Sequence, residues 1–209
     1  MIKTSAIPKW AKITFAVVLA VGAGVVVSRT AVSAFRPHLY AGTVLQGGTP
    51  APPMDGIHLA SGEEVDMNSW GGDVVLVYFG YTHCPDVCPT TLSTAAQAIT
   101  DLSDKNQERT QLLMVSVDPA RDTSDSLQEY VEFFDPDFLG ATGDVSDIDR
   151  VASQYGVFYE LGEGTIDEGY TVDHTATLMG IGPDGELRIV WPPDATADQM
   201  SSDIKELLS

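Results

Sequence analysis

Residues 74–89 read VVLVYFGYTHCPDVCP, and this stretch decides the fold of the 209-residue chain. It opens with β-branched and aromatic residues, which are typical of a strand buried on both faces. The run breaks at Gly80 into a loop that holds the two cysteines of the sequence, Cys84 and Cys88. The next segment, 90–103, has no Gly or Pro, and its apolar residues recur at helical spacing. The stretch therefore predicts a strand, a cysteine loop and a helix in succession.

The spacing of the two cysteines indicates chemistry rather than a structural crosslink. Cys84 and Cys88 are separated by three residues, whereas a disulfide that stabilises a secreted domain usually closes a long loop. Residues four apart share one face of a helix, and the backbone N–H groups and dipole at a helix N-terminus favour thiolate over thiol. The loop is therefore a candidate site for a soft metal ion, for a reversible disulfide, or for both.

Charge is divided unevenly along the chain. Residues 1–36 hold five basic residues and no acidic one, whereas residues 37–209 hold six basic and thirty acidic residues, a net charge of −24. A domain this acidic is not suited to contacts with the phosphate groups of nucleic acid, so nucleic acid is excluded as a partner. Two interpretations of the acidic surface remain: a solvated exterior, or a docking face for a basic partner.

The N-terminal segment 1–36 predicts export of the domain after it. Residues 13–27 read ITFAVVLAVGAGVVV, with lysines before the run and Arg29 after it. Fifteen apolar residues are short for a membrane span, which needs about 20, but an extension to Phe35 supplies the length. The alternative is a cleaved signal peptide with the small residues 32–34 at the cleavage site. Basic residues on the N-terminal side place that end in the cytoplasm under either interpretation.

The remaining pattern predicts one domain, at 56–209, after a Gly- and Pro-rich linker at 37–55. Strands and helices alternate, and a hairpin and a helix come last, which indicates a mixed sheet covered on both faces. With a cysteine pair at the first strand-to-helix junction, this is the thioredoxin-like arrangement. The expected elements are a hairpin at 56–66, strands at 110–117, 138–142, 175–181 and 187–191, and helices at 124–134, 145–155 and 196–208, with a polar glycine-containing loop at 162–169.

A metal site on two thiolates needs a further ligand, and the chain has four histidines. His38 falls in the expected linker and His58 in the expected hairpin, so surface positions are the better interpretation of both. His83 adjoins the first cysteine and is a second-choice ligand. His174 is expected to start a buried strand after a flexible loop, on the side of the cysteine loop. It is either a metal ligand or a capping histidine.

Three motifs together resemble one known family. They are YFGYTHCPDVCP at 78–89, SVDPARDT at 116–123 and VDH at 172–174. In this order they are similar to the Sco/SenC family, and the resemblance covers residues 60–209. Members of that family are membrane-tethered copper chaperones that help to assemble the dinuclear copper centre of cytochrome c oxidase.

The resemblance implies a ligand set of Cys84, Cys88 and His174. Thiolates select Cu(I) and imidazole also serves Cu(II), so such a site can hold copper in either state. Asp173 is expected either to orient the His174 ring or to cap the turn. Asp118, paired with the arginine of the same motif, is expected either to organise the site from below or to form an ordinary surface charge pair.

Two functions are consistent with the resemblance and the residues. The first is a copper metallochaperone, not an enzyme, that delivers copper to a copper-bearing oxidase subunit on the outer side of the membrane. The second is a membrane-tethered thiol–disulfide oxidoreductase in which Cys84 and Cys88 form a redox-active disulfide and reduce cysteines of that subunit. His174 separates the two, because a dithiol reductase needs no third ligand.

Overall fold

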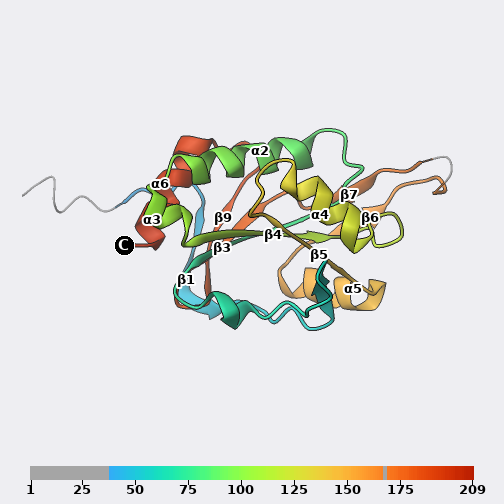
Figure 1. Ribbon diagram of the computed structural model, residues 1–209, viewed down its shortest axis with the longest axis horizontal. Coiled ribbons are helices and arrows are strands. Elements are labelled where there is room, and N and C mark those ends of the chain that lie inside the picture. Colours follow the sequence, from blue (N-terminus) through green and yellow to red (C-terminus); the bar gives the residue numbers. More distant parts are fainter. Residues whose placement is uncertain (1–37, 167–168) are drawn as a thin grey trace, which may run out of the picture. The chain divides into compact units, whose positions relative to one another are not determined.

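A computed structural model describes residues 38–166 and 169–209 of the protein. The chain divides at Leu39, and the unit from Tyr40 to Ser209 is built on one sheet. Its strands are β1 (Thr43–Pro50), β2 (Ile57–Leu59), β3 (Val74–Gly80), β4 (Thr110–Ser116), β5 (Leu139–Gly143), β8 (Leu178–Ile181) and β9 (Glu186–Trp191). Their order across the sheet is β1-β9-β8-β3-β4-β5-β2 (Figure 1).

The sheet is mixed and lies between helices, as predicted. β3, β4 and β5 are parallel, and the other neighbouring strands pair in antiparallel fashion. The helices are α2 (Val87–Thr100), α3 (Asp104–Gln107), α4 (Ser124–Glu132), α5 (Val145–Gln154) and α6 (Ala197–Leu207), with a 3-10 turn η1 (Met67–Trp70). In Figure 1, α2, α3 and α6 lie on one side of the sheet and α5 lies on the other.

The central strand explains why the cysteine motif dominates the fold. All seven residues of β3 are buried, because the strand is paired on both edges and covered on both faces. At its end, Gly80 allows a close approach to α2: a Cβ there would lie 3.0 Å from the Sγ atom of Cys88. A side chain at this position would push the helix away from the strand, so a glycine is required.

Residues 43–50 are not a linker, contrary to the prediction. They form β1, an edge strand that pairs with β9 and changes register between Val44 and Thr49. Gly47 and Gly48 adopt positive φ angles of 99° and 58° there, a conformation that glycine reaches without strain. The Gly, Thr and Pro content of the segment is typical of a linker, whereas pairing with β9 through the backbone makes it a strand.

The expected hairpin at 56–66 is present in short form: an isolated antiparallel bridge joins His58 and Glu64, and Val65 N–H donates to the Ile57 carbonyl, while β2 pairs with β5 as well. The prediction for His174 was wrong. His174 does not start β8. It ends a short strand, β7 (Val172–His174), that pairs with β6 (Tyr159–Leu161) in a separate two-stranded ribbon.

The predicted membrane anchor or signal segment at 1–36 lies outside the described residues. In the part of the chain that the structure describes, no helix is long and apolar enough to span a membrane.

Candidate metal centre

Three segments that are distant in sequence bring their donor atoms together. Cys84 lies in the loop after β3, Cys88 in the first turn of α2, and His174 at the end of β7. Their sulfur and ring nitrogen atoms all lie within 4.8 Å of one another. The Nε2 atom of His174 is 3.5 Å from the Sγ atom of Cys88. These are the residues that the sequence singled out as ligands, and the fold places them as one cluster.

The helix begins earlier than the sequence pattern suggested. α2 starts at Val87, so Pro89 falls in its first turn, where a missing N–H group breaks no helical hydrogen bond. The early start directs the backbone N–H of Cys88 at the Sγ atom of Cys84, 3.3 Å away. Both cysteines are buried and carry free thiols. The first turn of the helix thus donates a hydrogen bond to the first sulfur of the pair.

The expectation that the helix N-terminus favours a thiolate is wrong for Cys88. Burial raises the pKa of the Cys88 thiol to about 12, and the neighbouring Tyr78 hydroxyl and Tyr81 backbone offset only part of this effect. The Cys88 side chain is fully buried. Loss of hydration therefore outweighs the helix dipole at this sulfur, and Cys88 keeps its proton at neutral pH until a metal displaces it.

The ring of His174 is oriented for ligation. Its Nδ1 atom lies 3.3 Å from the carbonyl oxygen of Thr175, which can only accept a hydrogen bond. The proton is thereby held on Nδ1, and the Nε2 lone pair faces Cys88. Burial lowers the pKa of His174, so the imidazole is neutral at pH 7 and needs no deprotonation. Tyr78 and Tyr81 meet the ring edge-on, with centroids 6.1 Å and 5.8 Å away.

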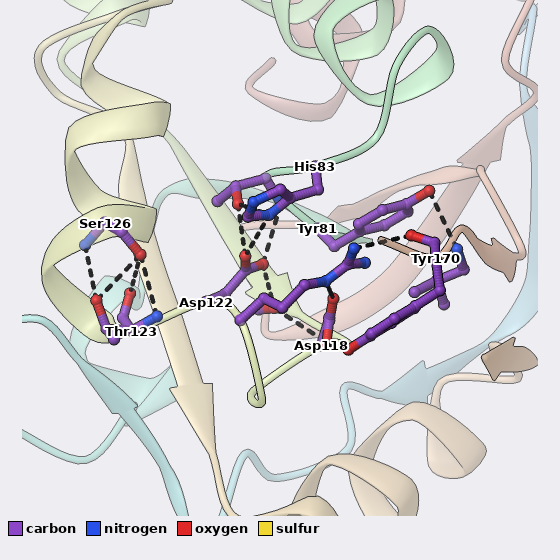
Figure 2. Close-up of polar contacts among 11 residues, drawn as sticks. Tyr81, His83, Asp118, Asp122, Thr123, Ser126 and Tyr170 are labelled. Carbon is purple, nitrogen blue, oxygen red and sulfur yellow. Dashed lines mark hydrogen bonds and ion pairs between the residues drawn. The ribbon is translucent and has the colours of Figure 1, made fainter. Parts of the chain in front are cut away.

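A buried clasp joins the Asp118 motif to the segment that leads to His174 (Figure 2). Arg121 donates from Nε to Asp118 and from NH1 to the carbonyl of Tyr170, at 2.8 Å in the second case. The Tyr170 hydroxyl donates a hydrogen bond to Asp118 at 2.7 Å. The guanidinium group of Arg121 also stacks on the Tyr170 ring, 3.6 Å from its centroid. The side chains of Asp118 and Arg121 are only 1% and 7% exposed, which contradicts the surface-pair interpretation.

A second buried carboxylate, Asp122, was not predicted from the sequence. It accepts hydrogen bonds from the backbone and hydroxyl of Thr82 and from the hydroxyl of Ser116, the last at 2.6 Å (Figure 2). Asp122 thus ties the start of the cysteine loop to the end of β4. The capping box of Thr123 and Ser126, which begins α4 directly after it, fixes the carboxylate in place. The motif holds two acids, and sequence alone does not show that both point inward.

The other candidates lie outside the donor cluster. His83 is exposed, with its Nδ1 atom 3.0 Å from the Thr82 hydroxyl and 3.7 Å from Asp122 (Figure 2). His58 is exposed on β2. Asp173 is exposed as well, and its negative charge acts to raise the pKa of His174. The Nδ1 atom of the His174 ring contacts the backbone carbonyl of Thr175 rather than the Asp173 carboxylate.

The donor set fits a soft transition metal. Two sulfurs and one imidazole nitrogen are the ligand types that copper and zinc prefer, and three protein donors leave room for an exchangeable one. Residues 58–209 match the description of SCO1/SenC. The chain belongs to the SCO1/SenC family. This membership agrees with the resemblance that the three sequence motifs carry.

Relatives of known identity share both sequence and fold. The chain is 41% identical over 133 residues to the human mitochondrial SCO1 homolog, covering 61% of this chain and 42% of that protein, so it spans less than half of that relative's length. The apo Sco1 structure from Thermus thermophilus is 35% identical with a TM-score of 0.72, covering 81% of this chain and 98% of that one. The copper-bound ScoI structure from Bradyrhizobium japonicum is 32% identical with a TM-score of 0.65, covering 77% and 98%.

These structural relatives confirm the fold that the Sco/SenC resemblance implied. The mixed sheet, with a cysteine loop between its central strand and α2, is the thioredoxin-like arrangement of the Sco proteins. Copper is present in the Bradyrhizobium relative.

Proposed function

We propose that this protein is a copper metallochaperone that carries a copper ion on Cys84, Cys88 and His174 and delivers it to the dinuclear copper site of cytochrome c oxidase. The observation that carries the proposal is the convergence of these three donor atoms within 4.8 Å. Sco proteins are cytochrome c oxidase assembly proteins, and a relative holds copper. The copper-bearing subunit of the oxidase is therefore the proposed acceptor.

The geometry suits a cargo ion better than a permanent one. Two thiolates bind Cu(I) strongly, and the neutral imidazole extends the site to Cu(II). Cys84 keeps a small exposed area and His174 is half-buried, whereas Cys88 is fully buried. An incoming ligand of the acceptor therefore approaches from the side of Cys84 and His174, while Cys88 holds the ion from the protein side.

Thiol–disulfide exchange is the second candidate function, and the proximity of the free thiols favours it. In this reaction one thiolate of the pair attacks a disulfide of the target, and the other resolves the mixed disulfide. Two electrons and two protons pass to the target, and a Cys84–Cys88 disulfide remains on this protein. We place copper carriage above this reaction because a dithiol reductase has no need of His174 as a third donor.

We also propose that segment 1–36 holds the domain on the outer side of a membrane. The support is the apolar run at 13–27 with basic residues before it, followed by an acidic domain that contains both cysteines.

Oxidase activity in copper-limited cells that lack the wild-type protein tests the main proposal. His174→Ala should fail to restore the activity if copper delivery is the function, whereas it should largely restore it if thiol reduction is the function. His83→Ala is the matched control, because that ring is exposed and outside the donor cluster. Full activity with His174→Ala would sink the chaperone proposal.

A further inference from the structure

A buried hydroxyl group without a partner lies next to the metal centre. Tyr78, in the middle of β3, is fully buried, yet its hydroxyl has no hydrogen-bond partner among the described residues. The buried hydroxyl of Thr91 on α2 lacks a partner as well. An unpaired buried hydroxyl costs free energy, and native structures keep few of them. Two such groups beside one metal centre indicate that a second state of the site uses at least one of them.

The Tyr78 ring lies near two of the donor residues. It stands edge-on to the ring of His174, with an interplanar angle of 76°. A Cβ built on Gly80 would lie 2.8 Å from the Cε1 atom of Tyr78 and 3.0 Å from the Sγ atom of Cys88, so the hydroxyl-bearing end of the ring is close to that sulfur. Cys88 and Thr91 both influence the phenol electrostatically, although in the metal-free protein neither makes a hydrogen bond of good geometry with its hydroxyl group.

We propose that Tyr78 is a positioning residue of the copper site, which donates its hydroxyl proton to the Cys88 sulfur when that sulfur is a copper-bound thiolate. A thiolate is a strong hydrogen-bond acceptor, whereas the thiol of the metal-free protein is a weak one. The phenol is a donor at neutral pH and is held in place by the packed core around β3. The inference rests on the proposed copper function.

The hydrogen bond would change the chemistry of the sulfur. A donated proton withdraws electron density from the thiolate, which favours Cu(I) over Cu(II). Tyr78 therefore keeps the cargo in the form that two thiolates hold best.

Tyr78→Phe is the test, since it removes the hydroxyl oxygen and leaves the ring. Without metal the variant should be as stable as wild type or more so, because an unpaired buried group is lost. Its Cu(I) affinity, measured by competition with a chromophoric chelator, should fall about tenfold. The sulfur-to-copper charge-transfer band of the Cu(II) form should move to lower energy. In a glutathione redox buffer, the metal-free pair should be oxidised as readily as in wild type, because the hydroxyl group makes no hydrogen bond to the protonated thiol.

Tyr155→Phe is the matched control. The Tyr155 hydroxyl donates to the carbonyl of Pro52 at 2.8 Å, away from the donors, so this variant should lose stability and keep wild-type copper binding. Unchanged Cu(I) affinity in Tyr78→Phe would overturn the inference, and so would a loss of metal-free stability like that of the control. If wild type itself binds no Cu(I), the proposed function fails first.

Discussion

The Nε2 atom of His174 lies 3.5 Å from the Sγ atom of Cys88, although the residues are 86 positions apart in the chain. The cysteine is held by the central strand and its helix, whereas the histidine belongs to a two-stranded ribbon outside the main sheet. The site therefore joins a rigid half to a half that depends on a few buried contacts. Substitutions in the two halves should therefore have different effects on copper binding.

His174→Ala should affect the two oxidation states of copper unequally. Two thiolates remain, and Cu(I) tolerates linear coordination by them, whereas Cu(II) needs the imidazole. We expect most Cu(II) binding to be lost and part of Cu(I) binding to remain, with both thiols still reactive. Equilibrium dialysis of the reduced protein with each ion checks this. Normal Cu(II) binding by His174→Ala, together with loss of it in His83→Ala, would show that the histidine assignment is wrong.

Arg121→Met should loosen the histidine half. It leaves Asp118 buried without its ionic partner and frees the Tyr170 carbonyl, so the free energy of unfolding should fall by about 3 kcal/mol. Because that clasp holds the segment before His174, Cu(II) affinity should fall about tenfold and Cu(I) affinity less. Denaturant unfolding and copper titration measure both effects.

Arg188→Met is the control for the clasp. This arginine pairs with Asp184 and Glu186 at a partly exposed position, so its loss should cost less than about 1 kcal/mol and leave copper binding unchanged. Equal copper affinities in Arg121→Met and wild type would mean that the clasp does not position the ligand.

Asp122→Asn should disturb the cysteine half. The amide would direct donor hydrogens toward the Thr82 and Ser116 groups that now donate to the carboxylate, and we expect a loss of about 2 kcal/mol in unfolding free energy. Both copper ions should bind more weakly, unlike in His174→Ala. Asp125→Asn, at an exposed position on α4, is the control and should resemble wild type. Weakening of Cu(II) alone would contradict this account.

The parts of the fold that could be predicted from the sequence are those with a strong local cause. The apolar run of β3, the cysteine spacing and the helical period after it predicted the central strand, the helix and two of the three clustered donor residues, because each pattern lies within one short segment. β1 escaped prediction because its glycines and its pairing with β9 are visible only once the sheet exists.

The site beneath the ligands was harder to predict for a similar reason. Asp122 and Tyr170 owe their roles to partners 40 to 52 positions away, and no periodicity in the sequence reports such contacts. The raised pKa of Cys88 likewise depends on burial by the whole domain, which outweighs the local helix dipole.

Membrane attachment is expected for the full chain. If the run at 13–27 is retained as an anchor, carbonate washing of membranes should leave the protein in the pellet, because only hydrophobic insertion survives that treatment. Externally added protease should then remove the acidic domain from intact spheroplasts. A soluble mature form that begins near Phe35 would instead support the cleaved signal peptide.

Copper binding should be coupled to proton release at Cys88. Burial raises the pKa of this thiol from 9.0 to about 12, so at pH 7 the incoming Cu(I) must displace a proton there. Cu(I) affinity should therefore rise with pH between about 6 and 9, and the slope should be shallower by about one proton in Cys88→Ser. Competition titrations at several pH values, with a chelator of known protonation, measure both slopes.

In the metal-free protein, the titration of Cys88 should be visible in the pH dependence of the free energy of unfolding. Because the folded pKa of Cys88 lies above the unfolded value of 9.0, the stabilising contribution of the protonated thiol is complete below pH 9. It is lost as the pH rises from 9 through about 12, where the unfolded chain releases its proton first. Cys88→Ala should remove this alkaline loss, whereas an unchanged loss in that variant would assign it to other groups. A Cu(I) affinity independent of pH would show that Cys88 binds no metal or is already ionised.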